Sequence, residues 1–314
     1  MASMAGRTLL AYFLDERSED GEQVRFAVSD GPSAAGWTVL ADGVPFLRSN
    51  VGELGARDPF LVRLRSGDAV LIATDLRIWP DSVADWERAV RYGSRSLLVW
   101  RSSDLVTWSG PSLVEVAPAE AGNVWAPKAF WSSERGAFLV FWASALFGDA
   151  PRSGKQHQRI MFAETSDFMT FGEPSVYLDL GHDIIDMTFA QENGLFYRFS
   201  VNAEPPLEGP HGFITMEVGE SLEDPNFRPL STGLGSPDLV RAEGPAIAPL
   251  PDGSGWALLL DEFRLRGYQL FVTGSLATPQ WRHVRDPGLP DGARHGSMLP
   301  ITSAEAERLL HFRR

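Results

Sequence analysis

The chain has 314 residues, of which 44% are hydrophobic, and its 41 acidic and 28 basic residues give a formal net charge of -13. This length and hydrophobic content allow two ordinary domains or one large all-β domain with a sizeable core. The negative charge disfavours nucleic acid and anionic membrane surfaces as partners, and the absence of cysteine excludes disulfides, thiolate metal sites and cysteine nucleophiles.

The N-terminal segment, MASMAGRTLLAYFLD, has no apolar core followed by a small-residue cleavage site, so we find no signal peptide. No segment approaches the roughly 18 consecutive apolar residues of a membrane span. We expect residues 1–314 to form one domain, with residues 1–7 a tag remnant or disordered. The location is cytoplasmic if this N-terminus is native and secreted if a signal peptide was removed. The oligomeric state stays open.

Five segments share one pattern: an apolar run, a serine, and an aromatic residue a few positions later. They are VRFAVSDGPSAAGW from Val24, LLVWRSSDLVTW from Leu97, IMFAETSDFMTF from Ile160, FITMEVGESLEDPNF from Phe213 and QLFVTGSLATPQW from Gln269. Subtracting the numbers of the aligned serines, Ser29, Ser103, Ser166, Ser221 and Ser275, gives intervals of 74, 63, 55 and 54 residues. The chain therefore contains five repeat units.

Each unit predicts antiparallel strands, because runs rich in Val, Ile, Phe, Tyr and Trp are bounded by Gly, Pro, Asp and Ser. Three of these runs, GAFLVFWAS, GLFYRFS and GWALLLDEF, follow glycine-containing turns, which is typical of hairpins. Thr302 and Glu305 predict a capping box for one short helix, whereas RIWPDSVADWERAVRYGS from Arg77 is expected to be a long loop. Five such units favour an all-β, five-bladed β-propeller over a β-sandwich.

The two ends of the chain are expected to share one blade. RHGSMLPIT from Arg294 has no hairpin partner downstream, and TLLAYFLD from Thr8 has no inner strand before it. If the C-terminal strand is the innermost strand and pairs with the N-terminal blade, the ring closes and no inner edge is left unpaired.

The expected inner strands start at Asp58, the Trp125 to Lys128 segment, Asp186, Glu243 and His295. Each of these starts carries a charged or titratable residue. Because inner strands line the axis of a propeller, Asp58, Asp186 and Glu243 should face one another across one pocket; ordinary solvated strand ends are the alternative. Like charges in a confined pocket raise one another's proton affinity. A protonated acid opposite an ionised base is what hydrolysis of a glycosidic bond requires.

Five motifs in order, over nearly the whole chain, resemble glycoside hydrolase family 43: RDPFLVRL with ATDL, NVWAP with FLVFWAS, IID with FYRFS, EGPAIAPL, and RHGSMLPIT. The resemblance implies a five-bladed propeller that hydrolyses arabinosyl or xylosyl linkages with inversion. By motif, Asp58 matches the general base, Glu243 the general acid, and Asp186 the carboxylate that orients the acid and keeps it protonated. Inverting glycosidases hold the acid and the base roughly 6.5 to 9.5 Å apart.

We therefore expect an inverting, exo-acting glycoside hydrolase that removes α-L-arabinofuranosyl groups from plant-type oligo- or polysaccharides and requires no cofactor. A β-D-xylosidase on the same scaffold and a non-catalytic propeller that binds a glycan or a protein are the alternatives. Lys128 stands where the family pattern usually has an acid. This departure changes the charge of the pocket wall and leaves the substrate preference open.

Further residues are expected to bind substrate. Trp125, at an inner-strand start, and Trp79, in the long loop, are the expected partners of sugar rings, and Arg294 forms either hydrogen bonds to sugar hydroxyls or a surface salt bridge. The family's histidine that matches His295 lies on the axis, in some members beside calcium through water. Calcium is therefore an open expectation, although no dense carboxylate loop supplies the roughly 6 to 8 oxygens that it prefers.

Two other acids compete for these assignments. Asp183 lies close before Asp186, which is preferred because it directly precedes the MTF run. A second EGP motif at Glu208 precedes an outer-strand segment, so Glu208 is interpreted as a loop acid.

Overall fold

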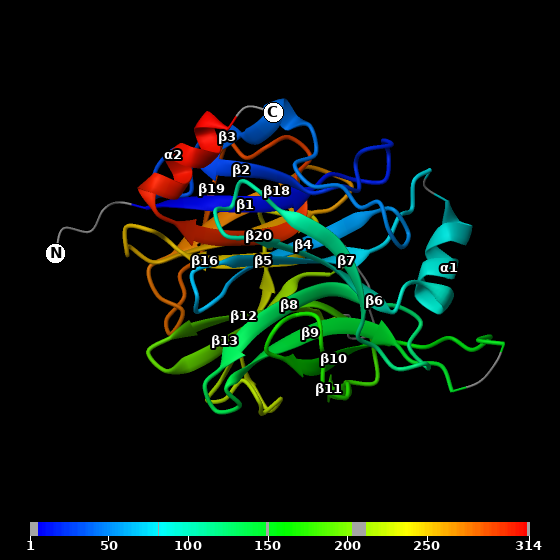
Figure 1. Cartoon of the computed structure of the whole chain (residues 1–314). Coiled ribbons are helices and arrows are strands. Elements are labelled where there is room, and N and C mark those ends of the chain that lie inside the picture. The colour runs from blue at the N-terminus through cyan, green and yellow to red at the C-terminus, as the bar shows by residue number, and fades with distance from the viewer. Residues whose placement is uncertain (1–5, 81, 149–150, 203–211, 313–314) are drawn as a thin grey trace.

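The computed structural model describes residues 6–80, 82–148, 151–202 and 212–312, and the statements below concern these residues. Their strands form five antiparallel, four-stranded sheets arranged around an axis (Figure 1). The innermost strands β20, β4, β8, β12 and β16 contact one another in a ring. The structure confirms the five-bladed β-propeller and excludes a β-sandwich.

We number the blades in chain order and give each from its innermost strand outward. Blade 1 contains β20 (Arg294–Ile301), β1 (Arg7–Phe13), β2 (Arg25–Ser29) and β3 (Trp37–Val39). Blade 2 contains β4 (Ala56–Arg63), β5 (Ala69–Asp75), β6 (Ser96–Ser102) and β7 (Ser109–Glu115). Blade 3 contains β8 (Trp125–Ser132), β9 (Ala137–Ala145), β10 (Gln158–Thr165) and β11 (Ser175–Leu178). Blade 4 contains β12 (Ile184–Glu192), β13 (Leu195–Asn202), β14 (Ile214–Gly219) and β15 (Arg228–Leu234). Blade 5 contains β16 (Glu243–Pro249), β17 (Trp256–Glu262), β18 (Gly267–Thr273) and β19 (Arg282–Val284).

Blade 1 closes the ring as the sequence predicts. Its innermost strand β20 pairs antiparallel with β1, from Ile301 opposite Arg7 to Arg294 opposite Phe13. Arg7 begins β1 and is therefore ordered, while the expectation of a tag remnant stays a prediction. Residues 1–5 lie outside the described part of the chain.

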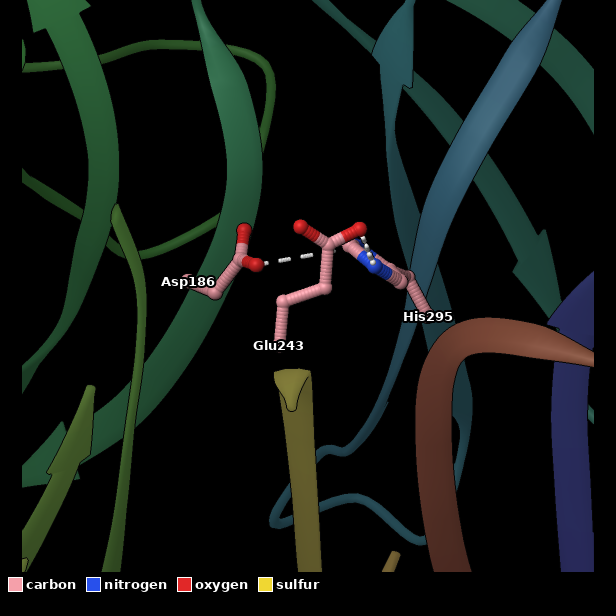
Figure 2. Close-up of side chains that lie close together, drawn as sticks. All are labelled: Asp186, Glu243 and His295. Carbon is pink, nitrogen blue, oxygen red and sulfur yellow. Dashed lines mark hydrogen bonds and ion pairs between the residues drawn. The ribbon is translucent and has the colours of Figure 1, made fainter. Parts of the chain in front are cut away.

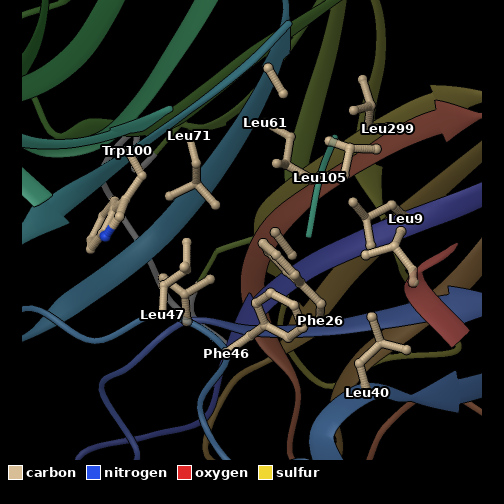
Figure 3. Packing of buried hydrophobic residues seen from close by; sticks show 14 of the residues in the cluster. Leu9, Phe26, Leu40, Phe46, Leu47, Leu61, Leu71, Trp100, Leu105 and Leu299 are labelled. Carbon is tan, nitrogen blue, oxygen red and sulfur yellow. The ribbon is translucent and has the colours of Figure 1, made fainter. Parts of the chain in front are cut away.

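The hydrophobic core is divided among the five interfaces between neighbouring blades. Between blades 1 and 2, for example, Phe26 and Leu299 meet Leu71 and Trp100 (Figure 3). Each blade is thus covered on both faces, which explains why its strands read as nearly continuous apolar runs. Burial of a Leu or Phe side chain contributes roughly 1.5 to 3 kcal/mol, so stability depends on all five interfaces.

Two α-helices and one 3-10 helix, η1 (Leu40–Gly43), accompany the sheets in the described residues. The helix α2 (Ser303–His311) begins with the predicted capping box of Thr302 and Glu305. The expectation of a long loop from Arg77 is wrong in part, because it contains α1 (Val83–Tyr92), whose first turn is capped by Ser82. Neither α-helix is long and apolar enough to span a membrane.

Candidate active site

A cavity of about 230 Å³ opens at the axis, where the inner strands begin. Residues from all five inner strands line it, and Glu16, Leu76, Trp86, Phe263 and Arg264 complete its wall. Asp58, Asp186, Glu243, Arg294 and His295 all face this cavity, as the sequence predicts. The structure therefore brings the three expected carboxylates together.

Each inner strand begins with a β-bulge, where the pairing register with the neighbouring strand shifts. At the bulges φ is 52° at Asp58, 51° at Ala126, and 55° at both Asp186 and Gly244. This left-handed backbone is uncommon outside glycine, although aspartate tolerates it better than most residues. Bulges re-aim side chains next to active sites, and here they turn consecutive residues toward the axis.

The bulges supply two successive rings of residues. The first positions are Arg57, Trp125, Ile185, Glu243 and Arg294, and the second positions are Asp58, Ala126, Asp186, Gly244 and His295. Glu243 thus stands one position before the equivalents of Asp58 and Asp186, which corrects the expectation of three equivalent acids. The Glu243 side chain is 18% exposed, against 9% for Asp58 and 8% for Asp186. Glu243 is therefore the acid best placed to meet a leaving group.

His295 contacts all three carboxylates, and Figure 2 shows its ring beside Glu243 with a dashed line to Asp186. Its Nδ1 is 3.2 Å from Asp58 Oδ1 and 3.7 Å from Asp186 Oδ2, and its Nε2 is 2.9 Å from Glu243 Oε1. Burial lowers the pKa of His295, but the charges of Asp186 and Glu243 and hydrogen bonds to Asp261 and Asp58 outweigh it and hold the pKa well above its usual range. The ring is therefore a cation.

Asp58 is buried and held in its ionised form. Its Oδ2 accepts a 2.7 Å hydrogen bond from Thr74 Oγ1, which in turn accepts one from the Ala126 N–H. Burial raises the pKa of Asp58, but His295, Arg57 and Lys128 outweigh this effect and hold it well below its usual range. An ionised carboxylate at neutral pH can accept a proton from water.

The pKa of Asp186 is shifted in the opposite direction from that of Asp58. Burial, with the negative charges of Glu243 and Asp58, raises the pKa of Asp186 to about 6 despite the opposing charge of His295. Its Oδ2 accepts a 2.9 Å hydrogen bond from the Gly244 N–H. Residue 244 must be glycine, because its φ is 55° and a Cβ there would lie 2.5 Å from Cδ2 of His295. The Gly244 N–H thereby fixes Asp186 next to the strand start that carries Glu243.

Glu243 contacts two cations through the same oxygen. Its Oε1 accepts a hydrogen bond from Arg294 Nη2 at 2.8 Å and lies 2.9 Å from His295 Nε2. The other oxygen, Oε2, points away from His295 (Figure 2). Because Asp58 and Glu243 contact the two nitrogens of one imidazole ring, their nearest oxygens are separated by at most two hydrogen-bond lengths and the width of that ring. The two cation contacts therefore involve Oε1 and leave Oε2 on the other side of the carboxylate.

The aromatic wall of the cavity differs in part from the prediction. Trp125 lines the cavity as expected, but Trp79 does not, and its backbone N–H instead donates to Glu22 Oε2. Trp86 of α1 takes the expected place of Trp79 and meets Trp125 edge to face, with ring centroids 6.2 Å apart. The Arg57 guanidinium stacks on Trp86, 5.0 Å from the ring centroid.

The residues around His295 do not fit a calcium ion. One ligand atom from each of Asp186, Glu243 and His295 lies within 4.8 Å of the others, but a histidine must be neutral to bind a metal. Here each ring nitrogen lies beside a carboxylate oxygen and is placed to donate to it, which is the arrangement of a protonated ring. Arg294 is buried beside Glu243 and supplies further positive charge. The donor set therefore lacks the roughly 6 to 8 free oxygens that calcium prefers.

The competing acids play other parts. Asp183 accepts a 2.7 Å hydrogen bond from the Gln158 N–H and does not line the cavity. Glu208 lies outside the described residues. Lys128 is buried rather than exposed on the wall, and its Nζ lies 5.4 Å from the centroid of the Phe60 ring. Arg294 is buried as well, so the alternative of a surface salt bridge is wrong.

Sequence reasoning missed several residues of the site, among them Glu16, Arg57, Trp86 and Asp261. Glu16 lies 3.3 Å from Arg57 Nη1 and 3.7 Å from Arg294 Nη1, and is buried with them. Asp261 contacts Arg294 and His295 and is fully buried. The signal that could have identified Asp261 is its place in the run WALLLDEF, where a carboxylate interrupts a buried strand.

Residues 6–307 match a family described as a probable glycosyl hydrolase domain, which is related to glycoside hydrolase family 43. An α-L-arabinofuranosidase of Bifidobacterium longum subsp. longum is 27% identical over an alignment 356 residues long. The alignment covers 93% of this chain and 33% of that protein. This chain therefore spans about a third of the length of that curated relative.

Solved structures resemble the fold at low sequence identity. A thermostable family-43 glycoside hydrolase aligns with a TM-score of 0.53 at 18% identity, covering 80% of this chain and 81% of the other. The GH93 α-L-arabinofuranosidase of Fusarium graminearum, in complex with arabinobiose, aligns with a TM-score of 0.57 at 14% identity, covering 95% and 84%. These similarities support the five-bladed propeller.

Proposed function

Because the chain belongs to the family of probable glycosyl hydrolase domains related to glycoside hydrolase family 43, we propose that it is an inverting glycoside hydrolase that removes α-L-arabinofuranosyl groups. The observation that carries this proposal is the convergence of Asp58, Asp186 and Glu243, from three blades, on one cavity around His295. A propeller that only binds a glycan has no need for three carboxylates that converge at this place.

The proposed reaction is a single displacement. Asp58 accepts a proton from water as the water oxygen attacks the anomeric carbon. Glu243 donates its proton from Oε2 to the glycosidic oxygen, whose bond to that carbon breaks. Asp58 is then protonated and Glu243 ionised, and exchange with solvent restores both. The two carboxylates face each other across one imidazole ring, which is compatible with the separation of about 6.5 to 9.5 Å in inverting enzymes.

The choice of sugar is supported by the comparisons. The curated relative is an α-L-arabinofuranosidase, and a solved structure with the same fold holds arabinobiose. We propose a neutral carbohydrate as the substrate and no metal requirement, in keeping with the donor set around His295. Aryl α-L-arabinofuranosides should be cleaved faster than aryl β-D-xylosides, with the rate unchanged by a chelator. Preferential cleavage of the xylosides would assign the chain to the alternative activity.

Variants of the two acids test the assigned roles. An activated aryl glycoside has a good leaving group and needs little protonation, so Glu243→Gln should lose far more activity on an alkyl arabinofuranoside than on the aryl substrate. Asp58→Asn should lose activity on both, because water still needs a base. General acids and bases contribute about 100- to 10,000-fold each, which turnover measurements resolve easily. Equal losses on both substrates for both variants would contradict the roles, and unchanged activity would place the reaction elsewhere.

A further inference from the structure

Asp261 is a buried carboxylate that the proposed reaction does not use. It lies on β17, directly opposite Glu243 of β16 in the strand pairing, and its exposed fraction is 0%. A buried ionised carboxylate is costly unless charged partners and hydrogen bonds compensate it. Its position one strand behind the general acid therefore requires a reason.

Asp261 and Glu243 share the same two cations. Asp261 Oδ2 accepts a 2.7 Å hydrogen bond from Arg294 Nε and lies 3.1 Å from His295 Nε2. Glu243 Oε1 contacts the same His295 nitrogen and Nη2 of the same guanidinium. Within the described residues, the Oδ1 atom of Asp261 has no hydrogen-bond partner. The polar contacts of the Asp261 side chain in the described residues are therefore with these two cations.

The other acids nearby cannot replace Asp261 in this arrangement. Glu16 Oε2 lies 3.7 Å from Arg294 Nη1, beyond hydrogen-bond distance, and is shared with Arg57. Asp58 and Asp186 face His295 through Nδ1, on the opposite side of the ring. Burial raises the pKa of Asp261, but Arg294 and His295 outweigh it and lower the pKa, so this carboxylate is charged.

We propose that Asp261 is a positioning residue that holds Arg294 and His295 in place and balances their charge while Glu243 is protonated. The inference rests on the proposed function, in which Glu243 alternates between a neutral and an ionised form in every turnover. If Glu243 were the only carboxylate touching both cations, they would favour its ionised form and oppose the uptake of the proton that it must donate. Asp261 supplies a permanent negative charge and removes this bias.

The test is the leaving-group dependence of Asp261→Asn. We expect its kcat to fall at least about tenfold more on an alkyl arabinofuranoside than on an activated aryl arabinofuranoside, within the range that a general acid contributes. Asp75→Asn is the matched control. Like Asp261, Asp75 is a buried carboxylate on the second strand of a blade and does not line the cavity, but its Oδ1 accepts the Glu53 N–H, whereas Asp261 contacts Arg294 and His295. Its loss of activity should be the same factor on both substrates.

A purely structural role for Asp261 would reduce both activities equally, and this result would overturn the proposal. If Asp261→Asn does not fold, Asp261→Glu keeps the charge and displaces it by one methylene group. Its kcat should then fall more on the alkyl than on the aryl arabinofuranoside, and either an equal fall on both substrates or wild-type kcat on both would overturn the proposal. Glu243→Gln is measured in parallel. If Glu243→Gln shows the leaving-group dependence and Asp261→Asn does not, only this inference fails. If Glu243→Gln lacks it, the proposed function itself fails.

Discussion

His295 sets the charge state of the pocket at the scale of single residues. The same imidazolium lies 3.2 Å from Asp58 and 3.7 Å from Asp186, yet the pKa of Asp58 is held low and that of Asp186 is raised to about 6. The difference follows from the neighbours, because Asp58 is hydrogen-bonded to His295 and lies near the Arg57 charge, whereas Asp186 lies beside the negative charges of Glu243 and Asp58. Carboxyl groups whose environments drive their pKa values apart are typical of paired acids and bases.

The raised pKa of Asp186 predicts a pH-dependent stability. Its pKa is about 6 in the folded chain against an ordinary value of 3.8, so the folded state binds this proton more tightly and stability is lost as the pH rises from about 4 to above 6. Asp186→Asn lacks this loss. Relative to wild type, its free energy of unfolding should rise between pH 4 and pH 7.5 by up to about 3 kcal/mol, as measured by urea denaturation. A difference that is independent of pH would contradict the prediction.

The sequence identifies some residues of the site better than others for a physical reason. Asp58, Glu243 and His295 stand at strand starts within recognisable motifs, so their convergence follows once the blades are known. Asp261 ends an apolar run, and its burial depends on its cross-strand partner and on Arg294, which is distant in sequence. Glu16 lies in a strongly polar segment and is buried only because Arg57 reaches it. Such pairings are tertiary and have no local signal.

Among the secondary-structure elements, the β-bulges and α1 shape the pocket. The β-bulges are common to all blades, whereas α1 belongs to blade 2 and brings Trp86 to the cavity wall. This helix escaped sequence analysis because it is short, polar on average and has one fully buried residue, Ala89, although its apolar and polar residues lie on different faces. Its N-cap, Ser82, was the remaining local signal. Because the whole segment is interpreted as a loop, the sequence gives no position for Trp86 relative to the cavity.

Removal of the α1 cap should weaken substrate binding. Ser82 Oγ accepts a 3.1 Å hydrogen bond from the Asp85 N–H, so Ser82→Ala should destabilise the helix by about 1 kcal/mol and loosen Trp86. We expect faster hydrogen exchange in residues 83–92 and a KM raised by up to about fivefold, the factor that this energy corresponds to, with kcat nearly unchanged. Thr302→Ala removes the equivalent cap of α2, which does not line the cavity. If both variants change KM equally, Trp86 and α1 do not shape the binding site.

In the molecule as a whole, the closed ring of blades both stabilises the fold and positions the residues of the site. Repeat spacing and the unpaired segments at the two ends predicted the five blades and their closure, because these signals are periodic and extend over the whole chain. Closure also delivers Arg294 and His295 to the axis at the start of β20. Ser297 of the same strand donates to the Pro59 carbonyl and accepts the Leu61 N–H, which joins blade 1 to blade 2. The last strand therefore contributes to stability and to the site together.

Two truncations separate these contributions. Deletion of residues 294–314 removes β20, exposes the inner edge of β1 and opens two blade interfaces, so we expect loss of the cooperative thermal transition and of the native circular dichroism spectrum. Deletion of residues 303–314 removes α2 but leaves the ring closed. Because α2 buries Ala306 and Leu309 against the cluster between blades 1 and 2, this control should melt cooperatively at a lower temperature, having lost roughly 1.5 to 3 kcal/mol for the leucine alone. A chain without β20 that still melts cooperatively would show that the four complete blades hold together without closure.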